Sequence, residues 1–248
     1  MTQGMPGRIP VDTGWGEPLL RAPLAAPQRP ARVVIAGEFN SGKTWLANSL
    51  LGTQVLPTSF VTRTQLPTVV EFGARPRLVL ERHDGSRVTT GWEEIEAGAC
   101  EGRRLCVRLP SSRLSRLRLI DTPGLGDGDD AMARRVRGIC RTADVVLWCT
   151  SALQAWKASE LAFWLSLPTY VRDKGLLVLT FADMLRRDQE GARVLARLHA
   201  EAALYFRRVV VPAQVHDLLG NAGPECAPRA SQEPAVVRSP LEPVQLGV

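Results

Sequence analysis

The octapeptide at residues 37–44, GEFNSGKT, constrains the fold more than any other stretch, because it matches the phosphate-binding pattern G-x-x-x-x-G-K-[ST]. The run before it, residues 32–36, is apolar and rich in β-branched side chains, which is typical of a buried strand. The run after it, residues 45–51, is typical of a helix that ends at Gly52. The sequence therefore predicts a strand, a phosphate-binding loop and a helix, in that order.

The residue types of this loop suit the binding of a magnesium nucleotide. Two glycines let the backbone wrap a phosphate without an intervening Cβ, so that the loop N–H groups and the helix N-terminus point at the anion. Lys43 is expected to reach the β- and γ-phosphates, and the Thr44 hydroxyl is expected to bind Mg²⁺. The predicted phosphate-binding residues are Gly37, Asn40, Ser41, Gly42, Lys43 and Thr44.

A second motif, Asp121-Thr122-Pro123-Gly124, follows an apolar run at residues 117–120 that is typical of a strand. An aspartate at the carboxyl end of such a strand holds Mg²⁺ in P-loop proteins, usually through water. The backbone N–H of Gly124 is expected to sense the γ-phosphate. The following loop, rich in glycine and aspartate, is predicted to be the second switch.

The first switch is predicted to lie within residues 53–65, in a polar loop ahead of the next strand. Thr62 is the preferred second hydroxyl ligand of Mg²⁺, and it is expected to become ordered on the γ-phosphate. Thr58 and Thr64 are the alternatives.

The segment Thr180-Phe181-Ala182-Asp183 ends another buried strand, at the position of the base-reading motif [NT]-K-x-D. Thr180 and Asp183 are the nucleotide-binding residues predicted here, and Asp183 is expected to accept the N1–H and N2–H₂ groups of guanine, which adenine does not offer. Phe181 replaces the lysine of the motif, and its ring either stacks on the purine or turns into the core. Farther on, Ala213 is a weak candidate for contact with the guanine O6.

Strands and helices alternate between these motifs, which is typical of a three-layer α/β fold. We therefore predict a P-loop NTPase domain over residues 31–218, with a mostly parallel sheet and helices on both faces. Residues 1–30 and 219–248 are rich in proline and are predicted to be disordered. The strands are expected at residues 32–36, 67–72, 77–82, 87–90, 104–109, 117–120, 143–150, 175–180 and 208–211, and the helices at 45–51, 92–99, 130–141, 157–167 and 189–207.

Composition sets limits on the partners and the compartment. The net charge of +6 and a pI near 9.5 permit contact with RNA or anionic lipid, but the arginines are scattered along the sequence, which disfavours a nucleic-acid site. Five cysteines without C-x-x-C spacing indicate reduced thiols and a cytoplasmic protein. No run of 18 apolar residues is present, so no transmembrane segment is expected.

The motifs together resemble the GTPase domain of bacterial dynamin-like proteins and their eukaryotic membrane-fusing relatives. The resemblance rests on the P-loop at residues 37–44, on Val55-Leu56-Pro57-Thr58 with Val61-Thr62-Arg63, on residues 119–126 and on residues 143–160. It implies a large-GTPase fold, hydrolysis of GTP to GDP with Mg²⁺, and a homodimer across the nucleotide face that completes the active site. Phe39 stands where the P-loop of eukaryotic dynamins has a glutamine, so the role of that glutamine is not transferred.

Dynamins remodel membranes through long helical stalks, and this sequence offers no segment for one. We therefore expect a small GTPase, or a partner of a stalk-bearing dynamin-like protein, whose membrane contact is peripheral. Two other functions fit the same residues. One is a nucleotide-gated interaction module with little turnover, and the other is a ribosome-associated or RNA-associated GTPase that uses its arginines. An ATPase is a further alternative, although no adenine-reading feature is present.

Overall fold

The computed structural model describes residues 29–57, 66–96, 101–126, 128–154, 156–184, 189–202, 204–206 and 208–210. Its strands are β1 (Ala31–Gly37), β2 (Thr68–Phe72), β3 (Arg77–Glu81), β4 (Arg87–Thr89), β5 (Arg104–Leu109), β6 (Leu117–Asp121), β7 (Val145–Ser151), β8 (Gly175–Thr180) and β9 (Val209–Val210). Its helices are α1 (Lys43–Leu51), α2 (Trp92–Glu96), α3 (Asp130–Cys140), α4 (Ala158–Leu165), α5 (Thr169–Arg172) and α6 (Gln189–Ala202).

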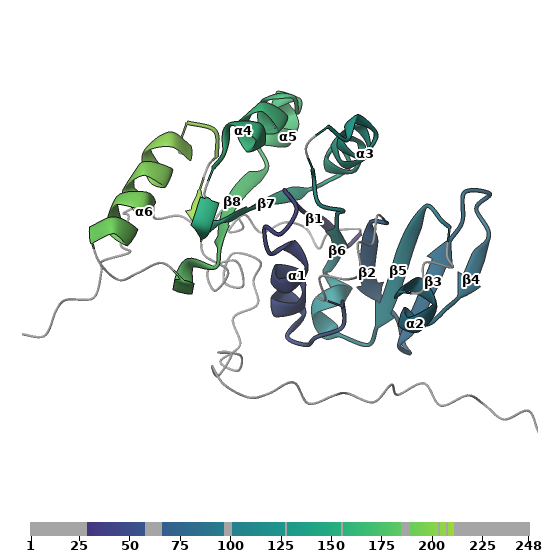
Figure 1. Cartoon of the computed structure of the whole chain (residues 1–248). Helices are drawn as coiled ribbons and strands as arrows, with labels where there is room; N and C mark the ends of the chain where they lie inside the picture. Colours follow the sequence, from purple (N-terminus) through teal and green to yellow (C-terminus); the bar gives the residue numbers. More distant parts are fainter. Residues whose placement is uncertain are drawn as a thin grey trace, which may run out of the picture.

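Within these ranges the strands form one nine-stranded sheet in the order β4-β3-β5-β2-β6-β1-β7-β8-β9 (Figure 1). The half from β6 to β9 is parallel throughout. The other half is mixed, because β2 runs antiparallel to β6, and β3 runs antiparallel to both β4 and β5. The predicted α/β P-loop fold is confirmed, and its antiparallel pairs lie on one side of β6.

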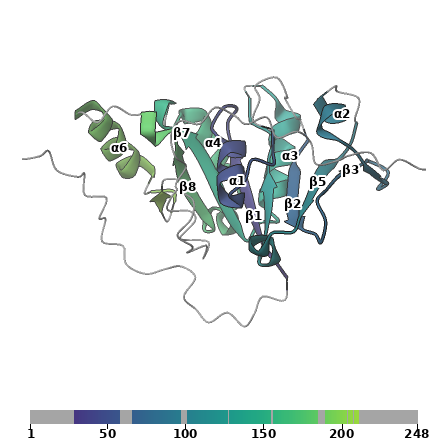
Figure 2. The ribbon, with the colours of Figure 1, turned by 90° about the horizontal axis from the view of Figure 1, so that it is seen from below.

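The alternation of side chains along β1 explains why both faces of the sheet are covered. Val33 and Ile35 point into a core that includes residues of α1 and α2, whereas Val34 and Ala36 point into a second core that includes residues of α3 to α6. A strand buried on both faces needs a continuous apolar run, and β1 provides one. Figures 1 and 2 show α1 and α3 on opposite faces of the sheet.

Two details of the helices differ from the sequence prediction. The helix α6 ends at Ala202, whose carbonyl accepts the N–H groups of Tyr205 and Phe206, and it does not reach residue 207. The chain turns there because Phe206 is buried and stacks on Trp164 at 4.3 Å between ring centroids. The short helix α5 was not predicted, and residues 97–99 of the predicted helix 92–99 lie outside the described ranges.

The aromatic residues on α4 and just before it belong to the core. Trp164 is fully buried and Trp156 nearly so, and Phe163 packs against the same core. These aromatic side chains therefore contribute to the packing between α4 and the sheet. None of the helices in the described ranges combines the length and the apolar character needed to cross a bilayer.

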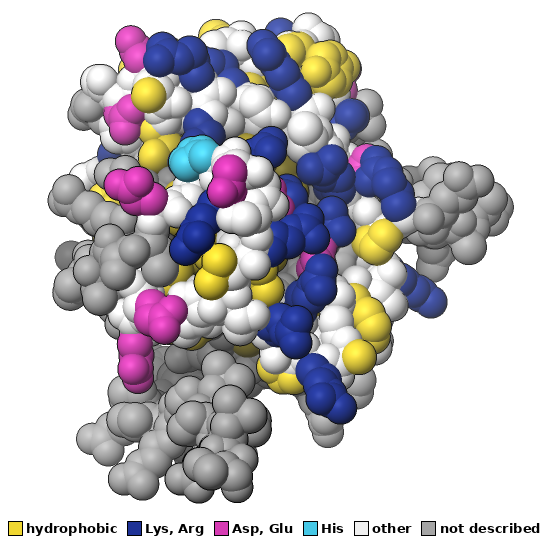
Figure 3. Space-filling model, turned by 90° about the vertical axis from the view of Figure 1, so that its right-hand side faces the viewer, with side chains coloured by type: hydrophobic (Ala, Val, Ile, Leu, Met, Phe, Trp, Pro, Cys, Tyr) yellow, Lys and Arg dark blue, Asp and Glu magenta, His cyan; other side chains and the backbone are white. Residues whose placement is uncertain are grey.

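Arginines that are scattered in the sequence come together beside β3, β4 and β5. Figure 3 views the molecule from that side and shows a band of Lys and Arg side chains. The carboxylates in this region are outnumbered, since Glu71 on β2 pairs with two arginines and Glu81 on β3 pairs with three. This face of the domain therefore carries a band of basic side chains, which the linear sequence does not show.

Candidate functional site

The P-loop connects the carboxyl end of β1 to the first residue of α1, and its backbone requires glycine at both ends. Gly37 has φ +152°, and a Cβ there would lie 2.3 Å from the carbonyl oxygen of Cys149 on β7. Gly42 is left-handed at φ +78°, with Thr180 and Phe181 directly against it. Asn40 is also left-handed, at φ +59°. The loop is thus curled tightly at the carboxyl edge of the parallel strands, where ligands bind in open α/β sheets.

Lys43 is held inside this loop. Its ammonium donates to the backbone oxygen of Glu38 at 2.6 Å and lies 3.5 Å from the hydroxyl of Ser41. Only 7% of the residue is exposed, and this burial lowers the pKa of Lys43, although the charge of Asp121 opposes the shift. The positive charge of this buried ammonium is only partly balanced by the neighbouring carboxylate. It can therefore stabilise the negative charge of a phosphate in the loop.

Thr44 and Asp121 come together from α1 and β6. The Thr44 hydroxyl donates to Asp121 Oδ2 at 2.8 Å, and Asp121 Oδ1 is buried without a hydrogen-bond partner in the described structure. Burial raises the pKa of Asp121 to about 6. A hydroxyl beside a buried carboxylate with a spare acceptor oxygen fits a hard cation such as Mg²⁺, which prefers oxygen ligands. The oxygen atoms of Thr44 and Asp121 therefore suit Mg²⁺, the metal that the sequence predicts.

The segment after Asp121 is fixed against the P-loop by backbone hydrogen bonds. Thr122 donates both its N–H and its hydroxyl to the carbonyl of Ile35. Leu125 N donates to Gly37 O at 3.2 Å, and Phe39 N donates back to Leu125 O at 2.8 Å. A Cβ on Gly124 would lie 2.8 Å from Phe39 Cα, so only glycine fits this close approach. The structure therefore brings Gly124 next to the P-loop.

The end of β8 lies on the other side of the loop. Thr180 is fully buried, and its hydroxyl donates to Ser41 O at 2.8 Å. This hydrogen bond fixes the P-loop to the end of β8. Phe181 is left-handed at φ +55° and lines the cavity above the loop. Of the two orientations open to Phe181, the structure supports the one toward the ligand cavity. Asp183 lies in a short 3₁₀ turn, Ala182–Met184, and its side chain is not described.

A cavity of about 650 Å³ opens above these residues, which is a size typical of small-molecule sites. The P-loop, Asp121, Gly124 and Phe181 line it. Its rim carries large apolar side chains that are exposed, among them Phe39, 47% exposed, and Leu153, 60% exposed. Thr62, its alternatives Thr58 and Thr64, and Ala213 lie outside the described ranges.

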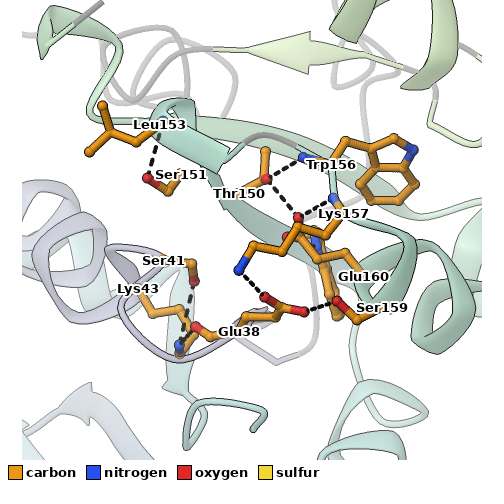
Figure 4. Close-up of polar contacts among 11 residues, drawn as sticks. Glu38, Ser41, Lys43, Thr150, Ser151, Leu153, Trp156, Lys157, Ser159 and Glu160 are labelled. Carbon is orange, nitrogen blue, oxygen red and sulfur yellow. Dashed lines mark hydrogen bonds and ion pairs between the residues drawn. The ribbon is translucent and has the colours of Figure 1, made fainter. Parts of the chain in front are cut away.

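The start of α4 contributes a group of contacts that the sequence did not predict (Figure 4). Glu160 is buried and accepts hydrogen bonds from Trp148 Nε1, the Thr150 hydroxyl and Lys157 N. The carboxylate of Glu38, in the P-loop, accepts from Lys157 Nζ at 2.9 Å and from the hydroxyl of Ser159. The pairing of a charged P-loop residue with a lysine more than a hundred positions away has no local signature in the sequence.

Comparison with known proteins decides the family. The sequence profile of the dynamin family matches residues 33–181, which is more than half of the chain. The chain belongs to the dynamin family. The match runs from β1 to Phe181 and therefore includes the P-loop, Asp121 and the end of β8. The domain is accordingly a dynamin-family GTPase domain.

Individual relatives agree with this assignment. Dynamin-like protein 2 of Campylobacter jejuni is 32% identical over 104 residues, which is 40% of this chain and 17% of that protein. The isoniazid-induced protein IniA of Mycobacterium tuberculosis is 32% identical over 146 residues, which is 53% of this chain and 23% of that protein. A probable transmembrane GTPase of Arabidopsis thaliana chloroplasts, FZO-like, is 29% identical over 161 residues, 65% of this chain and 16% of that protein. The chain thus spans a quarter or less of these relatives.

The fold agrees as well. A solved structure described as an oligomerised bacterial dynamin pair for long-range sensing and tethering of membranes superposes with a TM-score of 0.58 at 19% identity. The match covers 77% of this chain and 34% of that one. At this identity the likeness shows the fold alone, which is the P-loop GTPase domain described above.

Proposed function

We propose that this domain binds GTP with Mg²⁺ in the cavity above the P-loop and hydrolyses it to GDP and phosphate. The observation that carries the proposal is the convergence of Lys43, Thr44 and Asp121 at the carboxyl edge of the sheet, inside a cavity large enough for a nucleotide. Phosphoryl transfer depends chiefly on positioning and charge stabilisation, and this site offers both without an evident general base. The free thiols among the described cysteines support a cytoplasmic location.

Each residue has a distinct role in this proposal. Lys43 stabilises the negative charge that develops between the β- and γ-phosphates. Thr44 and Asp121 would hold Mg²⁺, and the ion would supply Lewis-acid polarisation of the phosphates. The N–H of Gly124 would sense the γ-phosphate, and Thr62 would be a further hydroxyl ligand of Mg²⁺. The role of Thr62 rests on the sequence alone.

Guanine recognition is proposed from Asp183 and Phe181. The carboxylate of Asp183 accepts hydrogen bonds from the N1–H and N2–H₂ groups of guanine, which adenine lacks. The ring of Phe181 stacks on the purine. The support for the second role is the position of Phe181 in the cavity wall beside Gly42. Comparing GTP with ATP tests this step separately from phosphate binding.

We further propose a homodimer across the nucleotide face. The support is the exposed apolar rim of the cavity, at Phe39, Trp45, Leu153 and Met184. Exposed apolar patches rimmed by polar residues mark interaction sites. The oligomerised dynamin pair shows that a protein of this fold assembles, and a stalk-bearing dynamin-like protein is the other partner we consider.

The direct test of the proposal is phosphate release from GTP by the wild-type chain and by Lys43→Ala. We expect the variant to keep its fold, because it loses a buried charge, and to lose GTP affinity by at least about thirtyfold, the equivalent of about 2 kcal/mol for a charge-assisted contact. Unchanged turnover in Lys43→Ala would refute the assignment of the site.

The second candidate is a nucleotide-gated interaction module with little turnover, and the apolar rim favours it as much as it favours an enzyme. Phosphate release measured against protein concentration separates the two. Dimer-stimulated hydrolysis rises faster than linearly with concentration, whereas a module without turnover binds GTP and releases no phosphate above the buffer control. Salt-dependent binding of RNA would instead support the RNA-associated alternative, through the arginine band beside β3, β4 and β5.

A further inference from the structure

We propose that Lys157 is a second phosphate-binding lysine of this site, which turns from Glu38 to the terminal phosphate of a bound nucleoside triphosphate. The inference rests on the proposed function, since it names a further residue of the same nucleotide site. Lys157 stands at the start of α4 and lines the same cavity as Lys43. Among the described residues that line this cavity, Lys43 and Lys157 are the ones with a positive charge.

The use of lysine in this chain makes that position unusual. Lys43, Lys157 and Lys174 are its only lysines, and arginine supplies the other basic residues. Two of the three therefore line the nucleotide cavity. A lysine differs from an arginine in carrying a compact point charge on a flexible stem, which suits a group that must move toward a phosphate.

Both ammonium groups meet at one P-loop residue. Lys43 Nζ donates to the backbone oxygen of Glu38 at 2.6 Å, and Lys157 Nζ donates to its carboxylate at 2.9 Å. Figure 4 shows both lysines near Glu38, Lys43 coming from the first residue of α1 and Lys157 from the start of α4. Lys157 is thus held beside the phosphate-binding loop.

The position of Lys157 is not explained by the capping of α4. The residue just before this helix is favoured to be Ser, Thr, Asp or Asn, whose side-chain oxygen accepts a backbone N–H. An ammonium has no acceptor. Only the reciprocal half of a capping box is present, in which Glu160 accepts from Lys157 N at 2.9 Å. The lysine side chain is directed to the P-loop and serves no cap.

The pairing with Glu38 is of a kind that a phosphate can replace. The Lys157 side chain is 43% exposed and the Glu38 side chain 17%, so water reaches the pair, and ion pairs that are open to water are weak. A terminal phosphate carries more charge and more acceptor oxygens than one carboxylate, so the ammonium gains by turning to it. Glu38 keeps a donor when this happens, because Ser159 also donates to its carboxylate.

The test compares the affinities for GTP and GDP, with Mg²⁺, of the wild-type chain, Lys157→Met and Lys174→Met. Lys174 is the matched control, since its ammonium donates to Ala143 O and lies outside the cavity wall. We expect Lys157→Met to weaken GTP binding about tenfold, as loss of a charge-assisted contact does, and to leave GDP binding and both affinities of Lys174→Met unchanged. An equal loss for GTP and GDP, or no loss, would overturn the inference.

The double variant Glu38→Gln/Lys157→Met excludes an indirect effect. If Lys157 served only to neutralise Glu38, removal of the carboxylate as well would restore the wild-type preference for GTP over GDP. We expect the preference to stay reduced, and full restoration would contradict the contact with phosphate. If the wild-type chain binds neither nucleotide, the proposed function fails. If it binds both and Lys157→Met binds GTP equally well, only this inference fails.

Discussion

Thr44 and Asp121 are 77 positions apart in the sequence, yet the hydroxyl of one donates to the carboxylate of the other at 2.8 Å. The contact joins the first turn of α1 to the end of β6, two elements that meet only when β1 and β6 pair in parallel. It leaves Asp121 Oδ1 buried and without a partner in the described structure. A buried acceptor of this kind calls for a cation or a donor, and here the proposed ligand is Mg²⁺.

Asp121→Asn is expected to remove the dependence of GTP binding on Mg²⁺. The amide still offers Thr44 an acceptor oxygen and eliminates a buried charge, so the fold should be kept, but a neutral amide is a poor magnesium ligand. GTP affinity measured with Mg²⁺ and with a chelator checks this. The wild type should bind at least about tenfold better with Mg²⁺, and the variant should bind equally in both. A variant that still responds to Mg²⁺ like the wild type would exclude Asp121 from the metal site.

Gly37→Ala is expected to destabilise the domain by about 3 kcal/mol, the combined scale of backbone strain and overpacking. The new Cβ would lie 2.3 Å from the carbonyl oxygen of Cys149, on the neighbouring strand β7, and the backbone at φ +152° favours glycine. Chemical denaturation measures the free energy of unfolding.

Gly138→Ala is the matched control for that substitution. Gly138 lies within α3, and no atom within 4 Å would oppose its Cβ. Alanine there should raise stability by up to about 1 kcal/mol, because glycine is the weaker helix former. Equal losses in the two variants would mean that the close approach of β1 to β7 is not what requires Gly37.

The pH dependence of stability is expected to contain a contribution from Glu81. The hydrogen bond from Arg104 lowers the pKa of Glu81 below its ordinary value of 4.5. A carboxylate whose pKa is lower in the folded state adds stability above the unfolded pKa, and this contribution disappears as the pH falls through the folded pKa. The difference in unfolding free energy between the wild type and Glu81→Gln should therefore shrink between pH 7 and pH 3.

The comparison variant for Glu81 is Glu93→Gln, which removes the same formal charge from an exposed position on α2. The difference in unfolding free energy between the wild type and Glu81→Gln could instead stay constant from pH 7 to pH 3. That result would show that ionisation of Glu81 beside its arginines contributes nothing to stability.

Much of the fold could be predicted because its signals are local. The apolar run of β1, the glycine pattern of the P-loop and the aspartate after β6 each lie within a few residues, and together they indicate the meeting of Lys43, Thr44 and Asp121. The predicted end of α6 was wrong. The chain turns earlier because Phe206 packs against Trp164, and a helical pattern does not encode that contact.

The supporting contacts of the site could not be predicted, because they join residues far apart in the chain. Thr180 holds the carbonyl of Ser41 across 139 positions, and Lys157 pairs with Glu38 across 119. The orientation of Phe181 depends on a left-handed backbone that the sequence pattern does not require of a phenylalanine. Such features follow from the order of the strands in the sheet and appear only in three dimensions.

The most direct measurement of the central claim is a titration of the purified chain with labelled GTP, GDP and ATP in the presence of Mg²⁺. We predict saturable binding of GTP and GDP, at least about tenfold weaker binding of ATP, and loss of GTP binding in Lys43→Ala. A folded protein that binds none of the three nucleotides, or whose GTP affinity is the same in Lys43→Ala, would contradict the account.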